Sequence, residues 1–164
     1  MSLAHALLAE IDHEAKTTQR VLERIPEDKV NWKPHPKSMS LGELGMHIAY
    51  APLVLSEVAV KDLHEFGSSP KMPPPTRQAI LDTFAASTQK VKDVVGSFDD
   101  TRMASTITMT KDGKTIMAIP RAAFIRKIMM NHIYHHRGQL SVYLRLLDVP
   151  VPSIYGPSAD EKPA

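Results

Sequence analysis

Cysteine is absent from the 164-residue chain. Its absence excludes disulfide bonds, thiolate metal ligands and a cysteine nucleophile. The chain also has no apolar run long enough to span a bilayer, and Glu10 and Asp12 occur too early for a signal peptide. Lysine and arginine are scattered rather than gathered along one helix face, which gives no sign of a nucleic-acid site. We therefore expect a cytoplasmic protein without a membrane or nucleic-acid partner.

What the chain does contain is the composition of one globular domain. Hydrophobic residues make up 43% and charged residues 23% of the sequence, which are ordinary values for a folded protein of this size. We expect a single domain over residues 1–164. Apolar residues recur at spacings of three, four and seven in four stretches, a pattern typical of helices with one buried face. These stretches cover residues 3–25, 41–58, 77–96 and 120–147.

Local signals mark where these helices begin and end. Pro26 ends the first stretch, Ser40 and Glu43 form a capping box that begins the second, and Thr76 caps the third. The segment Gly67–Pro75 is too long and too rich in proline for a tight turn, so we expect a crossover loop between the second and third helices. Four long helices joined in this way predict an all-α protein, a four-helix bundle.

One segment departs from the helical pattern before the fourth helix. Residues 106–109 and 115–117 are rich in threonine, isoleucine and methionine, and they flank Asp112-Gly113. Asp-Gly between two such runs favours a two-residue hairpin turn. The sequence therefore predicts a short β-hairpin, with an irregular loop as the alternative.

The most informative residues lie in the fourth helical stretch, where His132 and His136 are four positions apart. At about 100° per residue they project from one helix face, one turn apart. Both fall within the apolar stripe, where two charged imidazoles would repel each other and an unpaired neutral one is unfavourable. His47 lies on the apolar stripe of the second helix. We predict that His47, His132 and His136 bind one metal ion, with His135 as the alternative to His136.

Imidazole nitrogen suits Zn²⁺, Ni²⁺, Co²⁺ or Fe²⁺, and the pattern does not distinguish among them. Three protein ligands would leave a position open on the metal, as in catalytic zinc sites. The motif is not that of a zinc metalloprotease, because Ile133 stands where that motif has a glutamate base. Glu43, one turn before His47, is the best candidate for a base, although its capping role explains it equally well.

Other polar side chains surround the histidines in the sequence. We expect Tyr134 and Gln139 to orient ligands or substrate. Arg137 and Arg145 have the spacing of ordinary exposed helix charges, and we expect both to face solvent. The sequence assigns no residue to catalysis or to binding an organic cofactor.

Three segments together resemble the DinB family of DNA-damage-inducible proteins, four-helix bundles related to the bacillithiol and mycothiol S-transferases. One segment is Asn31–Pro34 with Ser40–Ile48, which is similar to that family's first-ligand segment. Another is the run His132–Leu140, and the third is the tail Pro152–Glu161. Together they span nearly the whole chain.

The resemblance implies that His47, His132 and His136 are the metal triad and that the chain forms a homodimer. It also implies a reaction in which a low-molecular-weight thiol is transferred to an electrophilic small molecule. Two other functions stay open at this point. One is a metal-dependent hydrolase, in which a metal-activated water attacks an ester or amide. The other is a metal-binding stress protein that is not an enzyme.

Overall fold

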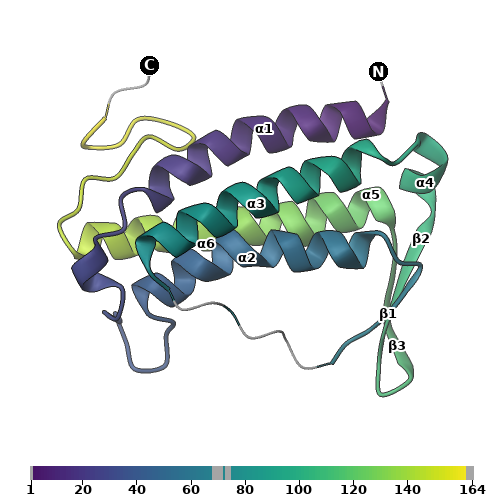
Figure 1. Ribbon diagram of the computed structural model, residues 1–164, viewed down its shortest axis with the longest axis horizontal. Helices are drawn as coiled ribbons and strands as arrows, with labels where there is room; N and C mark the ends of the chain where they lie inside the picture. Colours follow the sequence, from purple (N-terminus) through teal and green to yellow (C-terminus); the bar gives the residue numbers. More distant parts are fainter. Residues whose placement is uncertain (1, 68–71, 73–74, 162–164) are drawn as a thin grey trace.

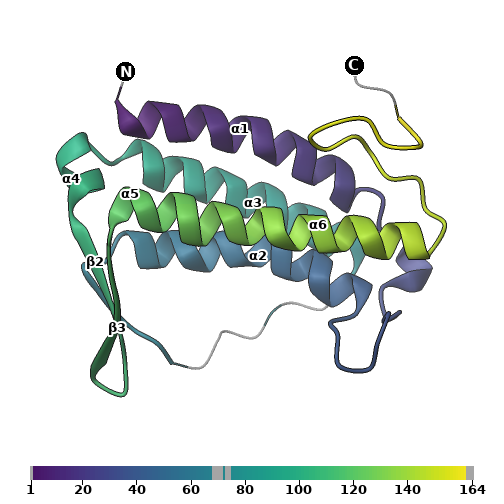
Figure 2. The same ribbon diagram turned by 180° about the vertical axis from the view of Figure 1, so that it is seen from behind.

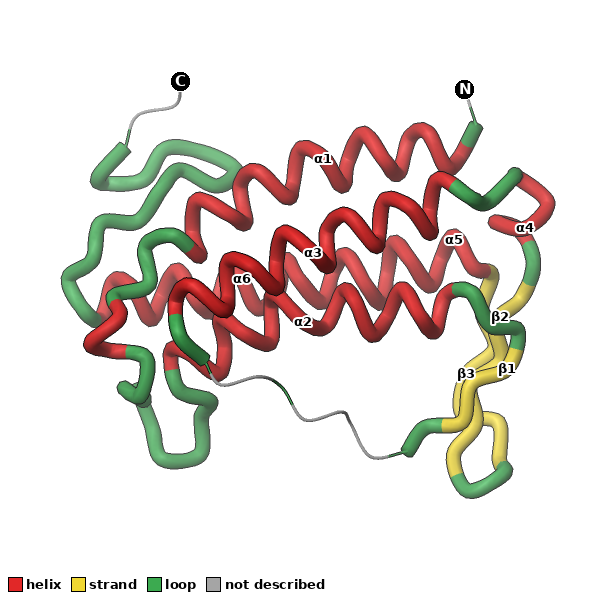
Figure 3. Tube along the Cα trace, viewed as in Figure 1, coloured by secondary structure: helices red, strands yellow, loops and turns green. Residues whose placement is uncertain are grey.

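The computed structural model describes residues 2–67, 72 and 75–161, which form a mostly helical fold with a small three-stranded sheet at one end (Figure 1). Figure 3 shows the helices and strands separately coloured. The elements in chain order are α1 (Leu3–Leu22), the 3₁₀ turn η1 (Glu27–Lys29), α2 (Leu41–Ala59), β1 (Leu63–Glu65), α3 (Arg77–Gly96), α4 (Asp100–Ala104), β2 (Thr106–Lys111), β3 (Lys114–Pro120), α5 (Arg121–Ala123), the π-helical segment η2 (Phe124–Met130) and α6 (Asn131–Leu146).

All four predicted helical stretches are present, and they lie side by side in both views (Figures 1 and 2). Helix α3 packs against α1 and α2, and α6 packs against the same two helices. Helices α2 and α3 run in the same direction in both figures, as expected for helices joined by a crossover connection. Most of the predicted crossover loop, at residues 68–71 and 73–74, lies outside the described residues. Among the described residues, no helix is both long and apolar enough to cross a membrane.

The predicted caps explain where the helices begin. The Ser40 side chain accepts a hydrogen bond from the backbone of Glu43, whose carboxylate accepts one from the backbone of Ser40, so the capping box is confirmed. Thr76 accepts from the backbone of Ala79 in the same way at the start of α3. Each of these bonds satisfies an N–H group that the first helical turn leaves without a partner.

The last stretch is less regular than predicted. Pro120 is the residue before the first helical one, rather than the first helical residue itself. Seven residues, Phe124–Met130, then follow a π-helical course before α6 begins at Asn131. A π-helix is wider than an α-helix, is rare, and is frequently found at functional sites. The segment that carries His132 and His136 therefore follows directly on a distorted turn.

The predicted hairpin is confirmed, and it belongs to a larger sheet. Strands β2 and β3 pair in antiparallel fashion. Asp112 and Gly113 join them with positive φ angles of 51° and 71°, which suit a hairpin turn. The third strand, β1, was not predicted; it pairs in parallel with β2 so that Leu63 lies opposite Thr108.

Arg121 connects this sheet to the end of α2. The side chain is fully buried, and its guanidinium donates to the carbonyls of Ala59 at 2.6 Å and Lys61 at 2.7 Å. It also pairs with the Asp62 carboxylate at 2.7 Å. The last carbonyls of a helix have no helical partner. Arg121 satisfies two carbonyls at this end, which fixes the end of α2 and the start of β1.

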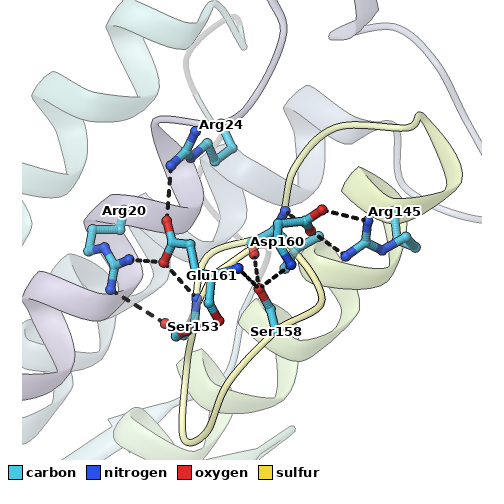
Figure 4. Close-up of polar contacts among 8 residues, drawn as sticks. Arg20, Arg24, Arg145, Ser153, Ser158, Asp160 and Glu161 are labelled. Carbon is cyan, nitrogen blue, oxygen red and sulfur yellow. Dashed lines mark hydrogen bonds and ion pairs between the residues drawn. The ribbon is translucent and has the colours of Figure 1, made fainter. Parts of the chain in front are cut away.

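The C-terminal segment folds back over the ends of α1 and α6 (Figure 4). Its residues 149–161 contain no regular element, but acidic side chains hold it in place. Glu161 pairs with Arg20 and Arg24 of α1, and Asp160 pairs with Arg145 of α6. Arg145 is exposed, as expected. The segment thus links the first and last long helices at the end opposite the sheet.

Candidate metal centre

Three histidines from two helices meet between α2 and α6. His47 comes from α2, and His132 and His136 come from successive turns of α6. One ring nitrogen from each lies within 4.8 Å of one from both of the others. The Nε2 atoms of His47 and His132 are 2.7 Å apart. The ring centre of His136 lies 4.6 Å from that of His47 and 4.4 Å from that of His132.

The packing of α2 against α6 brings the rings together. Leu44 and Ile48 of α2 are buried in the same apolar cluster as Leu140 and Leu144 of α6. Leu44 and Ile48 lie on either side of His47 in the chain, and Leu140 lies one turn after His136, so the packing that buries them also brings the imidazoles together. The histidines themselves are only half-buried. They lie at the edge of the core rather than inside it, where a small molecule can reach them.

Burial is the main reason that these imidazoles stay neutral. It lowers the pKa of His132 to about 4, with further lowering from the neighbouring histidines. Burial, and then the charge of His136, lowers the pKa of His47. Burial also lowers the pKa of His136, against the opposing effect of its hydrogen bond to Gln139. At neutral pH each ring therefore keeps a lone pair that can bind a metal.

Gln139 contacts one of the three histidines directly. Its side-chain Oε1 lies 2.7 Å from Nδ1 of His136. An amide oxygen can only accept, so Nδ1 carries the proton and Nε2 of His136 is left free. Such a partner on the far nitrogen is typical of metal-binding histidines. Gln139 therefore fixes both the tautomer and the orientation of the His136 ring.

His135 and Glu43, the other candidates from the sequence, lie outside the triad. His135 is exposed, with its ring centre 4.9 Å from that of His136, and it is not part of the triad. The Glu43 carboxylate is held through Oε2 by the backbone N–H of Ser40 at 2.7 Å and by Lys33 at 3.3 Å. The Ser40 bond is the main cause that lowers the pKa of Glu43, and Lys33 adds to it. These contacts are those of a helix cap, which is the structural role expected for Glu43.

The prediction for Arg137 was wrong. Its side chain is 1% exposed, and it pairs with Glu14 of α1 at 2.7 Å. It also donates to the hydroxyl of Tyr155 in the C-terminal segment at 2.6 Å and lies over the ring of Tyr134. Arg137 is rotated by about 100° from His136 on the helix, so it points toward α1 while the histidines point toward α2. Tyr134 belongs to the same cluster through this ring contact with Arg137. Its hydroxyl donates to Glu10 at 3.1 Å rather than to a histidine.

Glu14 and Tyr155 are the partners that the sequence did not reveal. Glu14 is buried on α1, where a carboxylate is costly unless it is paired. The sequence did contain a signal for this pair. Glu14 lies on the same buried face of α1 as Ile11 and Thr18, and a glutamate there calls for a buried cationic side chain as its partner. This ion pair holds α6 against α1 from the side opposite the histidines.

Known proteins share both the sequence pattern and the fold. The model of the DinB superfamily matches residues 10–140. Protein YrdA of Bacillus subtilis (strain 168) is 25% identical over 152 residues, which cover 92% of this chain and 86% of YrdA. Two solved structures have a TM-score of 0.71. The DinB-like protein YjoA of Bacillus subtilis is 20% identical, with 91% of this chain and 96% of that one covered. A DinB-like protein of Bacillus cereus ATCC 10987 is 23% identical, with 90% and 95% covered.

Proposed function

Because the chain belongs to the DinB superfamily, we propose that it is a metal-dependent transferase that couples a low-molecular-weight thiol to an electrophilic small molecule. His47, His132 and His136 bind the divalent ion. The observation that carries this proposal is the convergence of three imidazoles, from stretches 85 residues apart, at a half-buried place between α2 and α6. We also assign the four long helical segments to a four-helix bundle, in which α2 and α6 supply the site.

The donor set fits a divalent transition metal. Three neutral imidazole nitrogens suit Zn²⁺, Ni²⁺, Co²⁺ or Fe²⁺. The 2.7 Å contact between His47 and His132 is a hydrogen bond, so one Nε2 carries a proton. Ligation through both Nε2 atoms would need the tautomer in which that proton lies on Nδ1 of its own ring. Zn–N bonds of about 2.0–2.1 Å in a tetrahedral site place two nitrogens about 3.3 Å apart, a separation that a small side-chain rotation provides.

The composition of the site favours transfer of an external thiol. When bound, the ion would act as a Lewis acid that favours the deprotonated form of a thiol near neutral pH. The chain has no cysteine of its own to act as the nucleophile. In the transfer, the thiol loses its proton to solvent and its sulfur bonds to the electrophilic carbon. The leaving group departs with the electron pair of the bond that breaks.

Hydrolysis is less well supported, because it needs a general base beside the site. Glu43 is the nearest candidate along α2. Its carboxylate is held by Ser40 and Lys33, which lower its pKa and make it a weaker proton acceptor. No carboxylate belongs to the triad among the residues that the structure describes.

The test compares turnover of thiols and of esters by the same metal-loaded protein. Bacillithiol, mycothiol and glutathione are each supplied with monochlorobimane, and ester hydrolysis is measured in parallel. Transfer from at least one thiol, lost in His132→Ala and kept in His135→Ala, is the expected result. The second variant is a matched control, because His135 is an exposed histidine on the same helix.

Other outcomes point elsewhere. Ester hydrolysis that depends on His132, without thiol transfer, would favour the hydrolase. Stoichiometric metal without either reaction would favour the metal-binding protein that is not an enzyme. The homodimer and the cytoplasmic location stay predictions, and sedimentation of the metal-loaded protein tests the first of them.

A further inference from the structure

A small cavity lies between α1, α2, α3 and the segment that joins η2 to α6. Its volume is about 40 Å³, measured as the space that the centre of a water molecule can reach. One water needs about 10–15 Å³ by this measure, so the cavity is larger than a packing defect. Apolar side chains from all four helical segments line it, among them Ile11, Pro52, Val91 and Ile133. None of the three triad histidines does so.

Three of the four polar residues in its wall, Glu14, Thr18 and Tyr134, already have hydrogen-bond partners. The Glu14 carboxylate pairs with Arg137 at 2.7 Å. The Thr18 hydroxyl donates to the Glu14 carbonyl at 2.8 Å, and the Tyr134 hydroxyl donates to Glu10 at 3.1 Å. A buried water needs two to four polar partners. The fourth polar wall residue, Thr88, offers a single hydroxyl, which is fewer partners than a water needs, so the cavity favours an apolar occupant over water.

Two irregular helical turns border this space. Pro52 cannot donate the backbone hydrogen bond that α2 would otherwise make at this position. Met129 and Met130, at the end of the π-helical segment, also form part of the wall. Methionine adapts readily to occupants of different shape. Two places where regular α-helical hydrogen bonding is interrupted therefore contribute to the wall of the cavity.

The cavity lies next to a depression on the surface. A shallow depression of about 180 Å³ lies between α1 and α3, with Lys16, Gln19 and Gln89 among the residues around it. Ala15, Phe84 and Thr88 line both the depression and the cavity. These three side chains therefore stand between solvent and the interior, and two of them, Ala15 and Thr88, are small.

We propose that this cavity is a binding site for a small uncharged apolar group of a few carbon atoms, which enters between α1 and α3. The volume sets the size of the group, and the engaged polar side chains exclude a charged or strongly hydrogen-bonding one. Met129 and Ile133 line the cavity and flank His132 in the chain. The occupant thus contacts the same stretch of helix that carries a member of the triad.

Xenon is the probe for the test, because it is apolar and binds dry cavities by dispersion. Crystals of the protein as purified are studied with and without xenon pressure. The expected result is a xenon atom between Val91 and Ile133 under pressure and no ordered water there without it. In solution, xenon should shift the methyl resonances of Val91 and Ile133 while leaving those of Val142, which is 57% exposed, unchanged.

A filling variant and its control complete the test. Ala15→Leu places a larger apolar side chain at the cavity wall and should abolish the xenon shifts. Ala9→Leu makes the same change at an exposed position of α1 and should keep them. Ordered water in the wild-type cavity, or the absence of xenon from it, would overturn the proposal whether or not Ala15→Leu folds. Equal xenon shifts in wild type and a folded Ala15→Leu would do so as well.

Discussion

Gln139→Ala should weaken metal binding without unfolding the protein. The Gln139 oxygen lies 2.7 Å from Nδ1 of His136 and is the only described side chain that makes a hydrogen bond to this ring. Loss of such a partner typically reduces metal affinity by 10–100-fold. Gln139 is exposed and uncharged, so water can replace part of its effect. We therefore expect the lower end of that range, about tenfold, or about 1.4 kcal/mol.

A competition titration against a chromophoric chelator at pH 7.5 measures this difference. Gln139→Glu is the control for effects of the substitution on the helix itself. Glutamate keeps an oxygen that accepts the hydrogen bond from His136, and it adds a negative charge. Its affinity should equal or exceed that of the wild type. His135→Ala, one turn away and outside the triad, should bind metal as the wild type does. An unchanged affinity in Gln139→Ala would refute the role given to this side chain.

Three further predictions concern stability and follow from other parts of the fold. The pKa of His132 is about 4 in the folded protein and about 6.5 in the unfolded chain. Between these values the unfolded chain binds the proton more tightly, so the metal-free protein loses stability as the pH falls from 6.5 toward 4. His132→Gln should lessen this loss by roughly 1–2 kcal/mol in urea unfolding, after allowance for the half-exposed ring. Identical pH profiles of stability in the variant and the wild type would contradict this prediction. Arg137→Met should cost about 3 kcal/mol by leaving the Glu14 carboxylate buried and unpaired, and Glu14→Leu in the same chain should recover part of it. Gly113→Val should lower the free energy of unfolding by roughly 1–2 kcal/mol, because a φ of 71° is strained for valine. An unchanged unfolding midpoint would argue against that turn.

The sequence predicted the long helices because their signals are local. The Ser40–Glu43 box, Thr76 and the apolar spacings each act within a few residues, and the structure keeps them. The Asp112-Gly113 turn is local in the same way. Strand β1 was missed because its three residues gain their partner from β2, more than 40 residues later. The π-helical segment was missed because its amino acids suit an α-helix equally well.

The same difference explains what was foreseen at the candidate site. His132 and His136 share a face by helical periodicity alone, and His47 lies on the buried stripe of its own helix. Arg137 was misjudged because its burial depends on Glu14, on a different helix 123 positions earlier. Periodicity places a side chain on a face, but it does not identify the group that faces it from another helix.

Metal analysis of protein purified without an affinity tag tests the central claim most directly. Wild type and His135→Ala should each carry close to one equivalent of a divalent transition metal after gel filtration. His47→Ala, with its helical circular dichroism retained, should lose it, because a ligand from α2 is then missing from the triad. Equal metal content in wild type and His47→Ala would contradict a centre shared between α2 and α6.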